Sequence, residues 1–176
     1  MKKIVSLVLA LIMLFCALVL SSCGSNSGGN VEQSNTQNSV EQSNTQKEEE
    51  FYNLVDQTKD LLDIVADDIY SYWYDCIYND KYLDNISYAV NCAKRDNESN
   101  LNTIEENTTK IKNLYKEIKE GKLNSEAKAV MQAYNDYYTL VVEVSGSFKS
   151  YSESKETYKK ELASALDDFS FELDWL

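Results

Sequence analysis

The side chains of this sequence that could carry acid–base or metal chemistry are its carboxylates. Two groups of them are candidate carboxylate clusters, one at Asp67 and Asp68 and the other at Asp167, Asp168, Glu172 and Asp174. Neighbouring acids diverge on a helix, so they do not converge on one reacting atom or metal ion. The chain has no histidine, so the Glu-x-x-His pairs of di-iron bundles are absent, as are calcium loops and phosphate-binding glycine loops. We therefore expect a solvated acidic surface, no metal or cofactor, and a protein that is not an enzyme.

Two cysteines, Cys76 and Cys92, could form a disulfide. They lie eight residues on either side of Asp84, so a turn there places them at matching heights of a helical hairpin. A disulfide closing this loop would contribute on the order of 3 kcal/mol. Two buried free thiols are the alternative, and the sequence does not decide between them. A catalytic thiol is not expected because no histidine is present to activate it.

Aromatic side chains are densest around these two cysteines. Tyr72, Trp73 and Tyr74 point in different directions on a helix, so one buried face cannot take all three and some aromatic rings should be exposed. Exposed tyrosine offers rigid contact area with a polar hydroxyl, which suits binding of peptides, glycans or proteins. The alternative is that the rings only fill the rim of the core. The predicted partner-binding residues are Tyr72, Tyr74, Tyr78, Tyr82 and Phe148.

Long helices must position these side chains. The chain has no proline, and after residue 29 its only glycines are Gly121 and Gly146. Apolar residues recur in steps of three and four from Lys47 onward, which indicates helices that are apolar on one side. The predicted helices run from 48 to 78, from a cap at Asp84 or Asn85 to 120, from 124 or 125 to the weak segment at 145–147, and from 150 to the end.

Individual residues predict the helix boundaries. The polar stretch 94–102 predicts a kink within the second helix. Gly121 is predicted to end that helix in the left-handed conformation. Ser150 and Glu153 have the spacing of a capping box, so the fourth helix is predicted to begin at Ser150.

Each predicted helix carries one apolar stripe, so the stripes should face one another. Four such helices with short connections predict an all-α fold, an up-down-up-down four-helix bundle of long antiparallel helices. A three-helix core with a separate, protruding hairpin is the alternative. In the bundle, the turn near Asn79 and the loop 145–150 share the end opposite the N-terminal tether.

The N-terminal part of the chain has a different character. Lys2 and Lys3 precede the apolar run Ile4–Leu20, an order typical of a secretory signal. Residues 24–46 are rich in Gly, Ser, Asn and Gln, and the heptapeptide at 31–37 recurs at 40–46. A short polar repeat without apolar positions to bury does not build a solenoid, so this segment is predicted to be a flexible, disordered tether.

The signal ends in Leu20-Ser21-Ser22-Cys23, which resembles the lipobox of bacterial lipoproteins. The resemblance implies that Cys23 receives a diacylglyceryl group and that residues 1–22 are cleaved off as a signal peptide. It also implies that the chain stays anchored to the bacterial cell membrane, facing outside the cytoplasm. The predicted organisation is a signal at 1–22, a lipidated cysteine and tether at 23–47, and a helical-bundle domain at 48–176.

Charge narrows the class of partner. The net charge is −12, so nucleic acid, whose phosphates require Lys and Arg, is not an expected partner. The predicted function is that of a lipid-anchored extracytoplasmic protein that binds a protein, a peptide or an envelope component. The alternative is a structural or immunity-like envelope lipoprotein of the phage-exclusion type, without a small ligand.

Overall fold

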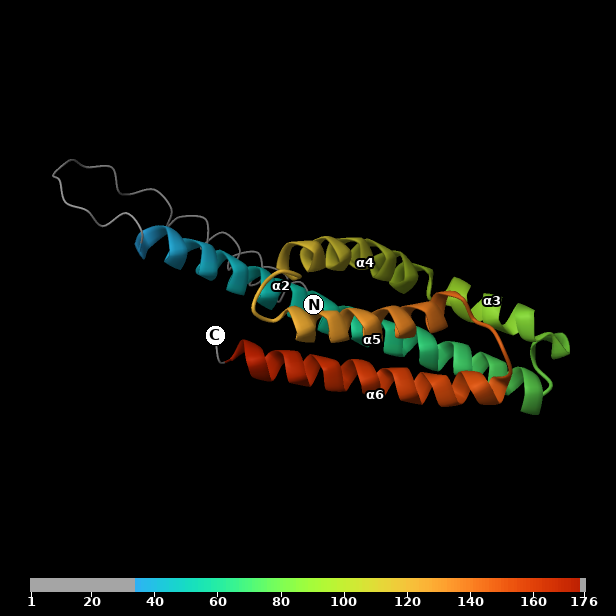
Figure 1. Ribbon diagram of the computed structural model, residues 1–176. Helices are drawn as coiled ribbons and strands as arrows, with labels where there is room; N and C mark the ends of the chain where they lie inside the picture. Colours follow the sequence, from blue (N-terminus) through green and yellow to red (C-terminus); the bar gives the residue numbers. More distant parts are fainter. Residues whose placement is uncertain (1–33, 175–176) are drawn as a thin grey trace, which may run out of the picture. The chain divides into compact units, whose positions relative to one another are not determined.

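The computed structural model describes residues 34–174, with side chains described from residue 44 onward. Within this part of the chain the secondary structure is entirely helical, and the prediction of an all-α fold is confirmed (Figure 1). The signal peptide, the lipobox and Cys23 lie outside the described residues. The described α-helices are α2 (Ser34–Tyr78), α3 (Ile86–Asp96), α4 (Glu98–Ile118), α5 (Asn124–Val142) and α6 (Phe148–Leu173).

Helix α2 has 45 residues and is therefore roughly 68 Å long. It begins at Ser34 instead of Glu48, so residues 34–46 of the predicted flexible tether are helical. The Gln, Glu and Lys residues before Phe51 favour a helix and nothing in this stretch interrupts one. The buried side chains of α2 follow the predicted steps of three and four: Phe51, Val55, Leu62, Val65, Ala66, Ile69 and Trp73.

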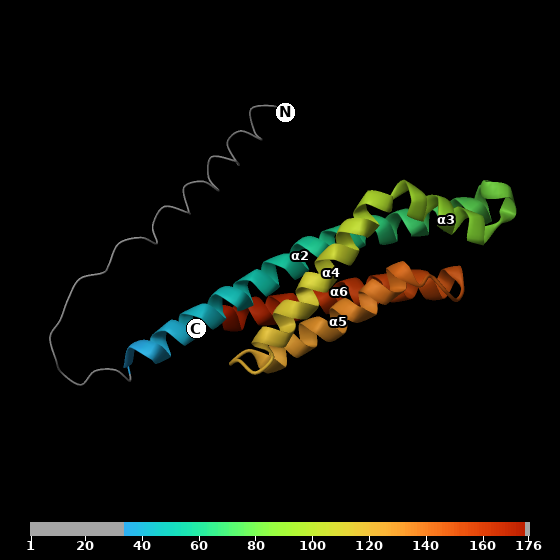
Figure 2. The same ribbon diagram turned by 90° about the horizontal axis from the view of Figure 1, so that it is seen from above.

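The predicted second helix is divided into α3 and α4, which confirms the predicted kink and places it at Asn97. The backbone of Asn97 has φ −106° and ψ 19°, outside helical geometry. Its buried amide donates to the Asp68 carboxylate at 2.7 Å and to the Ala93 carbonyl at 3.1 Å. Figure 2 shows the chain changing direction between the two helices.

Two further predictions about helix boundaries are wrong. Gly121 is not in the left-handed conformation; among the described glycines only Gly146 has a positive φ, at 84°. The capping box is formed by Ser147 and Ser150, not by Ser150 and Glu153, so α6 begins at Phe148. Ser150 N–H donates to Ser147 Oγ at 3.1 Å, and Ser147 N–H donates to Ser150 Oγ at 2.9 Å. Serine replaces glutamate as the returning acceptor, a variation that the usual capping-box pattern does not include.

The described helices from Thr36 onward pack into one compact unit. Helices α5 and α6 lie side by side in both views (Figures 1 and 2). Helix α2 packs on α6 through Phe51 and Phe169, whose ring centroids are 5.6 Å apart. Helix α4 meets α5 through a buried 2.6 Å hydrogen bond between the Thr108 and Tyr134 hydroxyls. The core therefore draws side chains from all five helices.

Candidate functional site

Exposed large apolar side chains concentrate where α2 turns back into α3. Of the eight that are exposed among the described residues, six lie within residues 74–88, the segment called the hairpin tip below. Single exposed apolar residues are ordinary, whereas large contiguous apolar patches are typical of interaction sites. Figure 2 shows this segment as the green end of the α2–α3 hairpin. The six residues are Tyr74, Ile77, Tyr78, Leu83, Ile86 and Tyr88.

Asp75 holds the turn of the hairpin tip together. Its carboxylate accepts from Asn79 Nδ2 at 2.6 Å and from Lys81 Nζ at 2.7 Å. Its carbonyl also accepts from the backbone N–H groups of Asn79 and Lys81, at 3.1 and 3.3 Å. The hydrogen bond from Lys81, followed by that from Asn79, lowers the pKa of Asp75 below its usual value. These two side-chain hydrogen bonds therefore favour the ionised form of Asp75.

The backbone of the hairpin tip is strained. Four residues that are not glycine have a positive φ: Asp80 at 50°, Tyr82 at 59°, Leu83 at 56° and Asp84 at 52°. For residues other than glycine the left-handed region costs roughly 1–2 kcal/mol each, and only aspartate and asparagine adopt it with any ease. Within this turn Leu83 has 89% of its surface exposed, and Asn85 then caps α3 by accepting from Tyr88 N–H at 3.0 Å. Strain of this kind concentrates at functional segments.

Three of the five predicted partner-binding residues form one aromatic patch between α2 and α6. The rings of Tyr74 and Tyr78 are 4.7 Å apart, and Phe148 lies 6.2 Å from Tyr74 and 6.1 Å from Tyr78. The ring of Tyr70 also stacks on that of Phe148, with their centroids 5.0 Å apart. The structure therefore brings Phe148 to the end of α2, although 70 residues separate it from Tyr78 in the chain.

The other two predicted residues lie on a different side of α2, against α3. Tyr72 is half-buried; it stacks on Tyr82 at 5.1 Å, and Tyr82 contacts Tyr88 at 6.4 Å. The Tyr72 hydroxyl donates to Asp96 Oδ2 at 2.6 Å, and this bond raises the pKa of Tyr72 to about 12. The five residues do not form a single surface, because Tyr72 and Tyr74 are roughly 200° apart around the helix.

Sequence reasoning missed Leu83, Ile77 and Ile86 as surface residues. The periodic pattern assigned Ile77 and Ile86 to buried stripes, yet they are 40% and 41% exposed. Both lie at the ends of their helices, beyond the side chains that would cover them. Leu83 carries no periodic signal, because it belongs to the turn.

Trp73 lies beneath the patch formed by Tyr74, Tyr78 and Phe148. Its ring is 6.0 Å from Phe148 and 5.6 Å from Tyr151, and the residue is 4% exposed. Its indole N–H is the one buried side-chain polar atom of the described residues that has no hydrogen-bond partner. An unsatisfied buried donor is unfavourable by roughly 1–3 kcal/mol.

Cys76 and Cys92 are two buried free thiols in the structure, so no disulfide joins them there. Cys76 follows Tyr72 by one helical turn and Cys92 precedes Asp96 by one turn, so the Tyr72–Asp96 contact sets them at matching heights. Burial raises the pKa of the Cys76 thiol, and the nearby Asp84 carboxylate raises it further. This thiol is therefore mostly protonated at neutral pH and is a poor nucleophile.

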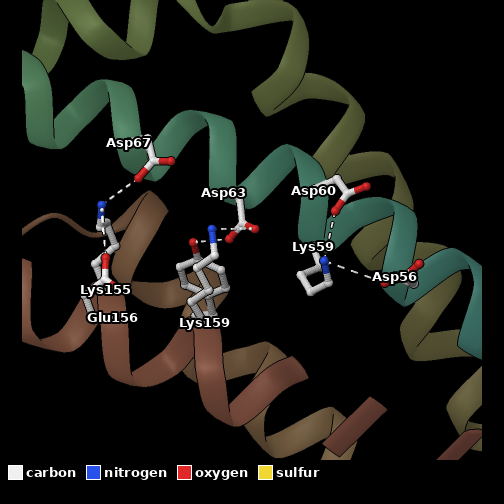
Figure 3. Close-up of polar contacts among 9 residues, drawn as sticks. Asp56, Lys59, Asp60, Asp63, Asp67, Lys155, Glu156 and Lys159 are labelled. Atoms are coloured by element: carbon white, nitrogen blue, oxygen red, sulfur yellow. Dashed lines mark hydrogen bonds and ion pairs between the residues drawn. The ribbon is translucent and has the colours of Figure 1, made fainter. Parts of the chain in front are cut away.

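The carboxylates of α2 that face α6 form interhelical contacts (Figure 3). Asp63 accepts from the Tyr137 hydroxyl at 2.6 Å and pairs with Lys159 at 3.0 Å. Asp67 pairs with the buried Lys155 at 2.5 Å. These contacts join α2, α5 and α6 and fix their register. Asp67 is exposed, as the sequence predicted, and its ion pair with Lys155 also gives it a structural role.

The remaining acids do not form a cluster of metal-ligating side chains in the described residues. Asp167, Asp168, Glu172 and Asp174 are all exposed, as predicted. No group of three metal-ligating side chains occurs in the part of the chain that the structure describes. A shallow groove of about 370 Å³ between α5 and α6 is lined partly by Asp136 and Glu143, both exposed.

No protein-family model, curated protein or solved structure matches this chain. Of the helices described, none combines the length and the hydropathy that crossing a lipid bilayer requires. The contacts and exposure described above are therefore the basis for assigning a function.

Proposed function

We propose that this protein is a lipid-anchored, extracytoplasmic helical protein that binds a protein, peptide or envelope component through its hairpin tip. The observation that carries the proposal is the concentration of six exposed large apolar side chains within residues 74–88. Water contact with these apolar side chains is unfavourable, and a partner that covers some of them removes part of that cost.

The length of α2 supports a role in which the helix holds the hairpin tip far from its own N-terminal end. The hairpin tip follows the last turn of this helix, roughly 68 Å from its first residue. With α3 and α4 taken as one broken helix, we propose an up-down-up-down four-helix bundle as the frame that holds the tip rigid.

Photo-crosslinking on intact cells tests the binding role. A photoreactive amino acid at position 83 should give a discrete crosslinked product that mass spectrometry identifies, because Leu83 is 89% exposed. The same group at Ile64, an exposed apolar residue in the middle of α2, is the control. Equal crosslinking at both positions would refute a binding site at the tip.

Cell fractionation tests the anchor independently. The Cys23→Ser variant should leave the membrane fraction, because the thiol that receives the lipid is gone. If this variant is processed and remains as tightly membrane-bound as the native protein, lipid anchoring at Cys23 is wrong.

A further inference from the structure

We infer that the partner of the hairpin tip presents a basic amphipathic segment, in which apolar side chains are flanked by Lys or Arg. This inference rests on the proposed binding function and names the chemistry of the partner. It follows from the charges that surround the exposed apolar residues.

Two acids at the tip have no ion-pair partner among the described residues, whereas each of its bases has a polar partner. Asp80 and Asp84 make no ion pair with any described residue, and both are exposed. They flank Leu83, the most exposed apolar side chain described. The positive charges at this end of the molecule are already paired: Lys81 with Asp75 at 2.7 Å, Arg95 with Asp96 at 3.3 Å, and Lys149 with Glu153 at 3.8 Å.

Lys94 is also engaged. It is half-buried, and its Nζ donates to the Val142 carbonyl at the end of α5 at 2.8 Å. Burial lowers the pKa of Lys94. Its amine faces the C-terminal end of α5 and not the tip. The unbalanced charge beside the apolar residues is therefore negative, as is the net charge of −12 for the whole chain.

This charge pattern disfavours two other occupants. Anionic lipid headgroups would be repelled by Asp80 and Asp84, although exposed Leu and Tyr side chains resemble a membrane-inserting loop. A second copy of this chain, bound tip to tip, would bring the same two carboxylates together, and like charges across an interface are unfavourable. A partner with Lys or Arg beside apolar side chains would cover the exposed apolar residues of the tip and also pair with Asp80 and Asp84.

The test uses the full chain with Cys23→Ser, to remove the lipid, and two synthetic amphipathic helices as probes. One helix carries Leu on its apolar face and Lys on its polar face, and the other carries Leu and Glu. Fluorescence anisotropy should show binding of the Leu/Lys peptide but not of the Leu/Glu peptide. Binding should weaken as salt is raised, because exposed charges are screened.

Matched variants separate the tip from the acidity of the whole protein. Asp80→Asn/Asp84→Asn should lower the affinity for the Leu/Lys peptide roughly three- to tenfold and reduce its salt dependence. Leu83→Ser should lower it by roughly tenfold or more. The controls are Asp167→Asn/Asp168→Asn, which removes the same charge from exposed positions on α6, and Ile64→Ser. Both controls should leave the affinity unchanged.

Several outcomes would overturn the inference. Equal loss in the α6 control would show that overall acidity binds the peptide. Tip-dependent binding to anionic or zwitterionic vesicles but not to the peptide would identify a membrane, and tip-dependent dimers in sedimentation would identify a second copy. If crosslinking at position 83 captures a partner while the peptide preference fails, the proposed function stands and only the basic partner is wrong.

Discussion

Replacing Leu83 by glycine should stabilise the protein while weakening its binding. Leu83 has φ 56° and ψ 33°, and its side chain is 89% exposed, so its removal takes almost no packing away. Relief of the left-handed strain gains roughly 1–2 kcal/mol, and the greater freedom of glycine in the unfolded chain costs roughly 0.5–1 kcal/mol. The net gain in unfolding free energy should be about 0.5–1 kcal/mol.

Leu83→Ala is the matched control for this prediction. Alanine also removes the apolar side chain but keeps a Cβ, so the backbone strain remains and stability should stay close to that of the native protein. Urea denaturation followed by circular dichroism gives the unfolding free energies. Thermal denaturation should show Leu83→Gly melting roughly 2–5 °C above Leu83→Ala.

The two variants should behave alike in binding, because both lack the leucine side chain. Crosslinking or peptide affinity should fall to a similar extent in each. If Leu83→Gly is no more stable than Leu83→Ala, the argument that the tip is strained is wrong. If both variants bind as well as the native protein, Leu83 is not part of the contact surface.

Three further predictions concern the helical frame. Tyr137→Phe should lower the unfolding free energy by roughly 1.5–3 kcal/mol, because the Asp63 carboxylate loses a 2.6 Å hydrogen bond. Tyr138→Phe is the control: the Tyr138 hydroxyl bonds to none of the described residues, so the unfolding free energy should change by less than about 0.5 kcal/mol. Gly121→Ala should destabilise by roughly 1–3 kcal/mol, since the new Cβ would lie 3.0 Å from the backbone carbonyl oxygen of Ile118, which cannot move without shifting the helix end. The 2.9 Å approach to Glu48 Oε1 involves the end of a flexible side chain, so most of the loss should persist in a Glu48→Ala background. Burial raises the pKa of Glu48, so this residue favours folding below its usual pKa and loses that contribution as the pH rises through the raised value. Glu48→Gln should therefore gain stability over the native protein between pH 4 and pH 7, and a difference independent of pH would contradict this.

Much of the helical frame was predictable from the sequence because its signals are local. The lack of proline, the scarcity of glycine and the spacing of Val55, Leu62 and Ile69 indicate helices and the face that each one buries. The kink at Asn97 was signalled by the polar stretch around it, and the tyrosine-rich end of α2 was correctly expected to be partly exposed.

Tertiary structure decided how far each buried stripe extends. Ile77 and Ile86 continue the periodic pattern, yet both are exposed. The pattern shows which side of a helix is apolar, but it does not show how far along that side a neighbouring helix packs. The division of Tyr72 and Tyr74 between two patches depends on which helix packs on each side of α2.

Contacts between residues distant in the chain could not be predicted from local sequence patterns. Glu48 approaches Gly121 across 73 residues, at a glycine that the sequence wrongly assigned to a left-handed helix end. The left-handed backbone at Leu83 carries no local signal, because leucine adopts it only where the surrounding turn requires it. The residue types established that this protein is helical and rich in exposed aromatic side chains; the folded chain decided which of them stand uncovered, because burial requires a neighbour that only packing supplies.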